Sequence, residues 1–348
     1  MSDKNPENTT TIVDNNIDDQ KESKSLVEKR LGKSLKVDIP VETMSTSRIQ
    51  SLCSPCDHKA PPELMEPFAY LCQTPGKDIR SRLVDAYNHW LKVDDRILDL
   101  VKKVVAMLHN GSLLVDDIED NSKMRRGQPV AHAIFGEPLT INCANYTYFL
   151  ALELVHNSGS AAAVKVFVDE LLHLHRGQGW DIYWRDNFQC PSLEMYEQMV
   201  IDKTGGLLRL AVKLMQSFSN NGADLITLTN HLGLYYQIRD DYINLASEKY
   251  MENKDYCEDL TEGKFSYPII HAILSNPEDR RLIHILKQRT TDVQVKKHAV
   301  EYIRKVGSLD HTKKVLDELE IKIKEDIKKL GGNRKLELIV QYLTENLI

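Results

Sequence analysis

Residues 108–120 read LHNGSLLVDDIED, an apolar helical sequence that runs directly into a group of carboxylates. Upstream, apolar residues recur at helical spacing, so one helix is expected over about Leu91–Leu114. If the helix continues, Asp116 and Asp120 lie one turn apart on the same face and repel each other. A bound cation is the simplest reason to place them there, and Mg²⁺ prefers carboxylate oxygens. The segment therefore predicts a helix that ends in a metal site.

A second acidic segment, QIRDDYIN, occupies residues 237–244 on another apolar helical stretch. Asp240 and Asn244 share one face of that helix. Two such helices facing each other would place several Mg²⁺ ions around one diphosphate group. Each segment alone is moderate support, because acidic groups are often solvated surfaces. Together they favour a diphosphate site.

Basic side chains accompany both acidic segments. Arg125 and Arg126 follow the first, and His109 precedes Asp116 by seven residues, so it points to a similar side of the helix. Each basic residue alone is typical of a solvated surface, but their grouping around two acidic segments indicates phosphate binding. The remaining candidates are Lys77 and Arg80 at an expected helix start, Lys203 with Thr204, and Lys254 with Lys264.

Composition limits the alternatives. The chain has 348 residues and a net charge of -6, which argues against a nucleic-acid partner. No apolar run is long enough for a membrane span, and the polar, acid-rich start favours the cytoplasm. Residues 1–45 are expected to form a disordered polar extension. Residues 46–348 are expected to form a single all-α domain, because helical stretches are separated only by short Gly, Pro, Asn and Asp breaks. Among the expected helical stretches are Ala161–Arg176, Leu193–Gln216 and Leu225–Leu245.

As a set, these segments resemble the trans-prenyltransferases, specifically the fungal-type geranylgeranyl diphosphate synthases of eukaryotes. The resemblance extends from about Glu63 to the C-terminal region. It implies an isoprenoid synthase fold, with antiparallel helices around a central active-site cavity, and a homodimer or higher homo-oligomer. The matching segments are PGKDIR (75–80), LHNGSLLVDDIED (108–120) with RRG (125–127), HRGQG (175–179), KTGG (203–206), QIRDDY (237–242) and CEDLTEGKF (257–265).

The resemblance also implies roles for individual residues. Metal ligands would be Asp116, Asp120 and Asp240, with Asp117 in support, for about three Mg²⁺ ions; these residues and Lys203 would form the catalytic set. Many relatives have Asp where this chain has Asn244, so Asn244 would act on a metal directly or through water. Isopentenyl diphosphate would be held by Lys77, Arg80, His109 and Arg126. The allylic diphosphate would be held by Arg125, Lys203, Thr204, Gln237, Asn244, Lys254 and Lys264.

Product length is expected to depend on a hydrophobic tunnel below the metals. Gly111 and Ser112 lie on the Asp116 helix, and their small side chains leave room for a twenty-carbon product. By resemblance, Tyr148, Phe149 and His173 would form the tunnel floor. For Tyr148 and Phe149, ordinary core packing remains an equal alternative.

The expected reaction is head-to-tail condensation of isopentenyl diphosphate with dimethylallyl, geranyl or farnesyl diphosphate. An allylic carbocation would form as diphosphate leaves, and the departed diphosphate would take the final proton. A class I terpene cyclase would share the fold but would not need a second diphosphate site. A non-catalytic partner subunit should have lost its acidic residues, whereas both acidic segments are intact.

Overall fold

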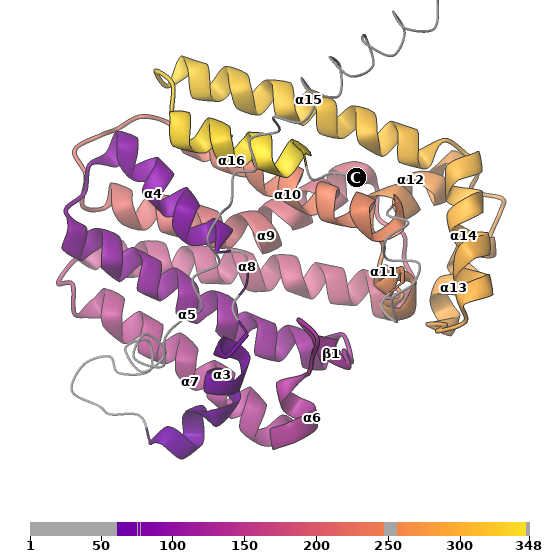
Figure 1. Cartoon of the computed structure of the whole chain (residues 1–348), viewed down its shortest axis with the longest axis horizontal. Coiled ribbons are helices and arrows are strands. Elements are labelled where there is room, and N and C mark those ends of the chain that lie inside the picture. The colour runs from indigo at the N-terminus through magenta and orange to yellow at the C-terminus, as the bar shows by residue number, and fades with distance from the viewer. Residues whose placement is uncertain (1–60, 75, 77, 247–255, 346–348) are drawn as a thin grey trace, which may run out of the picture. The chain divides into compact units, whose positions relative to one another are not determined.

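The computed structural model describes residues 61–74, 76, 78–246 and 256–345 of the chain (Figure 1). The described part is almost entirely helical, so the all-α prediction is confirmed. Its longer elements are α4 (Ile79–Leu91), α5 (Asp95–Glu119), α7 (Glu137–His156), α8 (Ala161–Asn187), α9 (Leu193–Gln216), α10 (Ile226–Ala246), α14 (Val293–Lys305), α15 (Ser308–Lys329) and α16 (Arg334–Glu345). Shorter elements are η1 (Pro62–Met65), α3 (Glu66–Cys72), α6 (Ala131–Phe135), α11 (Glu258–Glu262), α12 (Tyr267–Ser275) and α13 (Arg281–Gln288).

Side-chain caps set where several of these helices begin. The Asp94 carboxylate accepts a hydrogen bond from the backbone N–H of Ile97, so α5 begins at Asp95 rather than near Leu91. Ser160 caps α8 and Ser192 caps α9 in the same way. These three caps fix the residues at which α5, α8 and α9 begin.

Glycines let α8, α9 and α10 approach one another closely. A methyl group on Gly177 of α8 would lie 2.8 Å from the carbonyl oxygen of Met199 in α9, and closer still to the backbone nitrogen of Lys203. A methyl group on Gly233 of α10 would lie 2.9 Å from the Cα atom of Gly205 in α9. Since carbon atoms normally pack at about 3.5–4.0 Å, only glycine fits at these two positions. The polar residues on the three helices are thereby brought within reach of each other.

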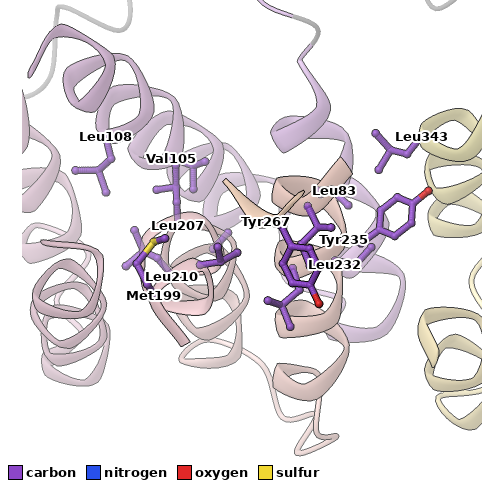
Figure 2. Close-up of a cluster of buried hydrophobic side chains, with 14 of the residues drawn as sticks. Leu83, Val105, Leu108, Met199, Leu207, Leu210, Leu232, Tyr235, Tyr267 and Leu343 are labelled. Atoms are coloured by element: carbon purple, nitrogen blue, oxygen red, sulfur yellow. The ribbon is translucent and has the colours of Figure 1, made fainter. Parts of the chain in front are cut away.

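A large hydrophobic cluster joins the helices that carry the polar residues. Figure 2 shows side chains from α4, α5, α9, α10 and α16 meeting in this cluster, among them Leu83, Val105, Leu207, Leu232 and Leu343. All five are at least nine-tenths buried. Each such residue contributes about 1.5–3 kcal/mol of burial free energy. The helices that carry the polar site are therefore anchored on a common core.

The structure also departs from the sequence expectations in three places. Helix α8 continues to Asn187, well beyond the expected end at Arg176. Helices α13 and α16 were not predicted as separate elements, and of α4 only the start near Lys77 and Arg80 was expected. A small antiparallel hairpin of β1 (Met124–Arg125) and β2 (Gln128–Pro129) follows α5, where no strand was expected. Among the described helices, none combines the length and apolar character that crossing a membrane would require.

Candidate active site

The acidic end of α5 is surrounded by basic side chains from other elements. Arg125 of β1 donates from Nε to the Oδ1 atom of Asp117 at 2.8 Å, and its Nη2 lies 3.6 Å from Asp116. Asp117 is buried, and burial raises the pKa of its carboxyl group although Arg125 opposes the shift. Asp117 therefore holds Arg125 beside Asp116.

Asp120 ends α5, and its carboxylate is held by Arg185 of α8. Nη2 of Arg185 also donates to the carbonyl oxygen of Glu119 at 2.8 Å. Burial, together with the nearby charge of Asp116, raises the pKa of Asp120 to about 6. The protein therefore keeps Asp116 and Asp120 close together at an electrostatic cost.

Lys203 of α9 connects α5 with α8. Its ammonium group lies 2.6 Å from Asp181 of α8 and 4.0 Å from Asp116. Burial opposes ionisation of Asp181, but Lys203 and Lys264 outweigh this and lower the pKa of Asp181. Burial lowers the pKa of Lys203, but the charges of Asp181 and Asp116 outweigh burial and raise it, so the lysine stays charged. A permanent positive charge is thus fixed between the two helices.

Gln178, on the same helix as Asp181, donates to two carboxylates of α5. Its amide nitrogen lies 2.7 Å from Glu119 and 3.3 Å from Asp116. Sequence reasoning assigned no role to Gln178, Asp181 or Arg185, although they recur at spacings of three and four residues. Such spacing places the three residues on one helix face. It could have indicated that α8 continues past Arg176 and presents a polar face to the site.

Asp241 of α10 is an organising group rather than an exposed ligand. It is 1% exposed and accepts hydrogen bonds from the Tyr196 hydroxyl, the Tyr267 backbone N–H at 2.8 Å and the Gln237 amide at 2.9 Å. Gln237 in turn accepts from the hydroxyl of Thr204 at 2.7 Å. This chain of bonds fixes the amide of Gln237 and connects α9 to α10.

The other acidic residues of α10 have different positions. Asp240 is exposed, and its charge partly offsets the burial that lowers the pKa of Arg80. The amide oxygen of Asn244 faces the backbone N–H of Asp259 at 3.4 Å, so it contacts the start of α11. Lys264, just after α11, lies 3.5 Å from Asp241 and 3.6 Å from Asp259. Lys264 therefore stands among carboxylates on the α10 side of the site.

Arg80 and His109 form a separate pair between α4 and α5. Nη1 of Arg80 lies 3.0 Å from Nε2 of His109. A guanidinium group has only donors, so Nε2 must accept, and the ring is neutral with its proton on Nδ1. Burial and the adjacent Arg80 lower the pKa of His109 well below its usual range. The pair presents one fixed positive charge beside a neutral ring.

Arg126 occupies a strained turn close to this pair. Arg126 and Gly127 both have positive φ values, 53° and 78°, as expected for the two central residues of a type I′ hairpin turn. Positive φ is costly for a residue with a side chain and often marks a functional position. The guanidinium group donates to the carbonyl oxygen of Thr74 at 2.5 Å, and a methyl group on Gly76 would lie 3.0 Å from it. A small pocket next to it is lined by Tyr70, Thr74, Arg125, Arg126 and Gln128, among others.

The residues predicted to control product length fall into two groups. A methyl group on Gly111 would lie 3.0 Å from the Tyr148 ring, so these two residues face each other across α5 and α7. Ser112 is half-buried and its hydroxyl donates to the carbonyl oxygen of His109. The Tyr148 ring packs edge-on against His175 of α8, with centroids 5.9 Å apart.

The structure does not bring His173 or Phe149 to that place. His173 lies 3.4 Å from Asp202 of α9, on another face of α8, because residues two apart on a helix point in different directions. Phe149 is 69% exposed. His175, rather than His173, is the histidine beside Tyr148. Lys77 and Lys254 lie outside the described residues.

The donors at the end of α5 fit Mg²⁺ in kind. Asp116, Asp120 and Asp240 offer hard carboxylate oxygens, and the Oδ2 atom of Asp117 is buried without a hydrogen-bond partner. Within the described residues, no three acidic, histidine or cysteine side chains already form a metal cage. Mg²⁺ ordinarily binds one or two carboxylates together with substrate phosphates instead of a full protein cage. The donor set therefore suits a cation that arrives with a diphosphate.

Comparisons with known proteins define the class. The polyprenyl synthetase family model matches residues 61–303, which include every described site residue. The chain therefore belongs to the polyprenyl synthetase family, and it is a metal-dependent trans-prenyltransferase. The resemblance seen in the motifs is thus confirmed.

Individual relatives narrow the class further. A geranylgeranyl pyrophosphate synthase of Dictyostelium discoideum is 51% identical over 82% of this chain and 94% of its own length. Another, from Mucor circinelloides f. lusitanicus, is 49% identical over 80% of this chain and 92% of its own length. A protein of Matsumurasca onukii named terpene synthase is 55% identical over 81% of this chain and 93% of its own length.

Proposed function

We propose that this enzyme is a geranylgeranyl diphosphate synthase, which condenses isopentenyl diphosphate successively with allylic diphosphates to give a twenty-carbon diphosphate. The observation that carries the proposal is the presence of two separate cationic regions. Arg80, His109 and Arg126 form one, while Arg125, Lys203 and Lys264 stand among the carboxylates of the other. Two cationic regions are what an enzyme with two diphosphate substrates needs.

The allylic diphosphate is assigned to the region between α5 and α10. Arg125, Lys203 and Lys264 would bind its oxygens, with Thr204 and Gln237 as polar partners and Lys254 as a further candidate. Positive charges fixed in advance stabilise the charge that develops on a leaving diphosphate. Lys203 needs no rearrangement for this role, because Asp181 already holds its ammonium group at 2.6 Å.

Isopentenyl diphosphate is assigned to Arg80, His109 and Arg126, with Lys77 as a further ligand. His109 is neutral, so Arg80 carries the positive charge of the pair. The hydrogen bond between them fixes the direction of the guanidinium group. None of these residues is needed as a base, since the departing diphosphate can accept the final proton. The described residues therefore act by binding, orienting and neutralising charge.

Magnesium is the proposed cofactor, with about three ions per site. Asp116, Asp120 and Asp240 are the proposed ligands, and Asp117 supports them through Arg125. The ions would supply additional positive charge to the leaving diphosphate. Asn244 contacts the backbone of Asp259 instead, which supports an indirect role for this residue through the position of α11.

Product length is assigned to the space beside Gly111 and Ser112. The facing rings of Tyr148 and His175 support a floor made by these two residues. Small residues at 111 and 112 leave the tail of a growing product room above that floor. This arrangement favours twenty carbons over fifteen.

A terpene synthase is the second candidate, because one relative carries that name. A cyclase acts on a single diphosphate substrate and would not need the half-buried Arg80–His109 pair or the strained turn at Arg126. These features favour a synthase. An activity on geranyl diphosphate alone would reverse this preference.

A homodimer is proposed through α7 and α8. On α8, Val168, Leu172 and Tyr183 are exposed at roughly helical spacing, and Phe149 of α7 is exposed as well. A second copy covering this face would explain why large apolar side chains remain outside the core. We further propose a catalytic domain over residues 46–348, with residues 1–45 as an extension. The described cysteines are free thiols, which suits the cytoplasm.

The proposal is tested by incubating the purified chain with Mg²⁺, radiolabelled isopentenyl diphosphate and five-, ten- or fifteen-carbon allylic diphosphates. The expected product is a twenty-carbon diphosphate, resolved by chromatography after dephosphorylation. Omission of isopentenyl diphosphate is the control for cyclase activity. Failure to elongate any allylic substrate would overturn the proposed function.

A further inference from the structure

Helix α5 carries a group of acidic residues at its C-terminal end, where carboxylates are least stable. The C-terminus of a helix has a partial negative charge, which repels carboxylates. Asp116, Asp117 and Glu119 all lie in the last turn of α5, and that turn contains no basic residue. The positive charges that balance this end must therefore come from other elements.

Two of those charges already have substrate roles. Arg125 contacts Asp117, and Lys203 lies between Asp181 and Asp116. Both therefore stand where the allylic diphosphate is proposed to bind. Arg185 is different, because it lies at the C-terminal end of α8 and its side-chain hydrogen bonds to described residues go to the end of α5 and to its own neighbour Asp186.

Arg185 uses each of its three nitrogen atoms. Nη1 donates to the Oδ1 atom of Asp120, Nη2 donates to the carbonyl oxygen of Glu119 at 2.8 Å, and Nε donates to Asp186 at 3.2 Å. The Arg185 side chain is 8% exposed. Arg289, which ends α13, contacts the same oxygen of Asp186 at 2.7 Å. Asp186 is thus shared between Arg185 and the more exposed Arg289.

We propose that Arg185 is a positioning residue of the metal site. Its bond to one oxygen of Asp120 fixes the carboxylate and leaves the second oxygen for the cation, while its bond to Glu119 caps α5 from another helix. The inference rests on the proposed function in one respect, since it takes Asp120 as a metal ligand. Groups that hold a metal ligand in place typically change metal affinity by about 10–100-fold when they are removed.

The planar shape of arginine is essential to this role. A guanidinium group can bond a carboxylate and a carbonyl oxygen at the same time, whereas a lysine presents a single point charge. Arg185→Lys should therefore retain the charge but lose one of the two contacts. Arg185→Gln should lose the charge and most of the geometry. The two variants separate the effect of charge from the effect of orientation.

The test measures metal binding without turnover. The metal-stripped full chain is given saturating inorganic diphosphate and titrated with Mg²⁺, and the rise in unfolding temperature gives the half-saturating Mg²⁺ concentration. Free Mn²⁺, measured by electron paramagnetic resonance, gives an independent binding curve. Arg289→Gln is the matched control, because it removes one positive charge from the exposed end of the same network.

We expect Arg185→Gln to raise the half-saturating Mg²⁺ concentration about ten-fold or more, with Arg185→Lys in between. Arg289→Gln should match the unchanged chain, because exposed ion pairs contribute little. In the synthase assay, high Mg²⁺ should restore the kcat of Arg185→Gln.

Each of the following results would overturn the proposal. A lower unfolding temperature with an unchanged half-saturating Mg²⁺ concentration would leave Arg185 only as a helix cap. Tighter Mg²⁺ binding in Arg185→Gln would make it a competitor of the metal. If the unchanged chain itself shows no Mg²⁺-dependent stabilisation, the proposed metal site fails first and Arg185 has nothing to position. Should Arg185→Gln fail to fold, Arg185→Lys alone decides, and an unchanged midpoint in that variant rejects the role.

Discussion

Gly177 of α8 lies against the backbone of Lys203 in α9 so closely that even one methyl group would collide with the Lys203 nitrogen. The contact sets the separation of the two helices at the level where the Lys203 ammonium group meets Asp181. The position of an active-site charge therefore depends on the absence of a side chain on the neighbouring helix.

Gly177→Ala should destabilise the protein by about 1–3 kcal/mol, because an overpacked contact must be relieved by moving α8 from α9. It should also reduce kcat, since Lys203 moves with α9. Gly179→Ala is the matched control: nothing lies within 4 Å of a methyl group there, and alanine is the better helix former by about 0.5–1 kcal/mol. Urea denaturation of both variants checks this prediction. Equal stability of the two would show that the helices can separate at no cost.

Asp241→Asn should be more harmful than its small chemical change implies. The carboxylate accepts from Tyr196, Tyr267 and Gln237 and lies near the charge of Lys264. An amide can accept at only one of its two ends, so at least one donor and Lys264 lose their partner. The expected loss is about 3 kcal/mol of stability, measured by chemical denaturation. The KM for the allylic substrate should also rise. Asp186→Asn, at an exposed ion pair, should change stability by less than about 1 kcal/mol.

Product length should respond to the residues that face Gly111. Ser112→Phe should shorten the main product towards fifteen carbons, and Tyr148→Ala should lengthen it, because the ring opposite Gly111 is removed. Phe149→Ala should leave the product distribution unchanged, since that side chain is exposed. Chromatography of dephosphorylated products distinguishes the three variants. An unchanged twenty-carbon product from both Ser112→Phe and Tyr148→Ala would remove these residues from the tunnel.

The neutral state of His109 should appear in the pH dependence of stability. Its folded pKa lies well below its usual value, because of burial and the charge of Arg80. Below about pH 6.5 the unfolded chain binds a proton at this residue that the folded chain does not. The stability contributed by His109 is therefore present above that pH and is lost as the pH falls. His109→Asn should show a smaller fall in the free energy of unfolding between pH 7 and pH 5, by at most about 1.4 kcal/mol per pH unit. Parallel curves for the two proteins would refute the assignment.

The helical spacing of apolar residues predicted those helix bounds that depend on local sequence alone. The bounds of α9 and α10 and the acidic end of α5 followed from apolar spacing, which is a local property. The extent of α8 did not, because its glycines at 177 and 179 read as breaks. Gly177 is in fact required by the approach of α9, and no local signal reports that contact.

The partners of individual site residues were also beyond local reasoning. Asn244 was expected near a metal, but its amide oxygen faces Asp259, which comes from a segment beyond residues 247–255. His173 and His175 differ by two positions, so their side chains point from different faces of α8. Only the packing of α8 against α7 shows that His175 faces Tyr148.

The arrangement at the end of α5 has a thermodynamic consequence. Carboxylates that repel one another are kept close together beside fixed positive charges, so neither a cation nor an anion alone leaves the site balanced. A cation that enters makes the site more attractive to a diphosphate, and a diphosphate does the same for the cation. The two affinities must be linked by the same factor in both directions. Measuring the affinity for one ligand at a fixed concentration of the other therefore reports on the site as a whole.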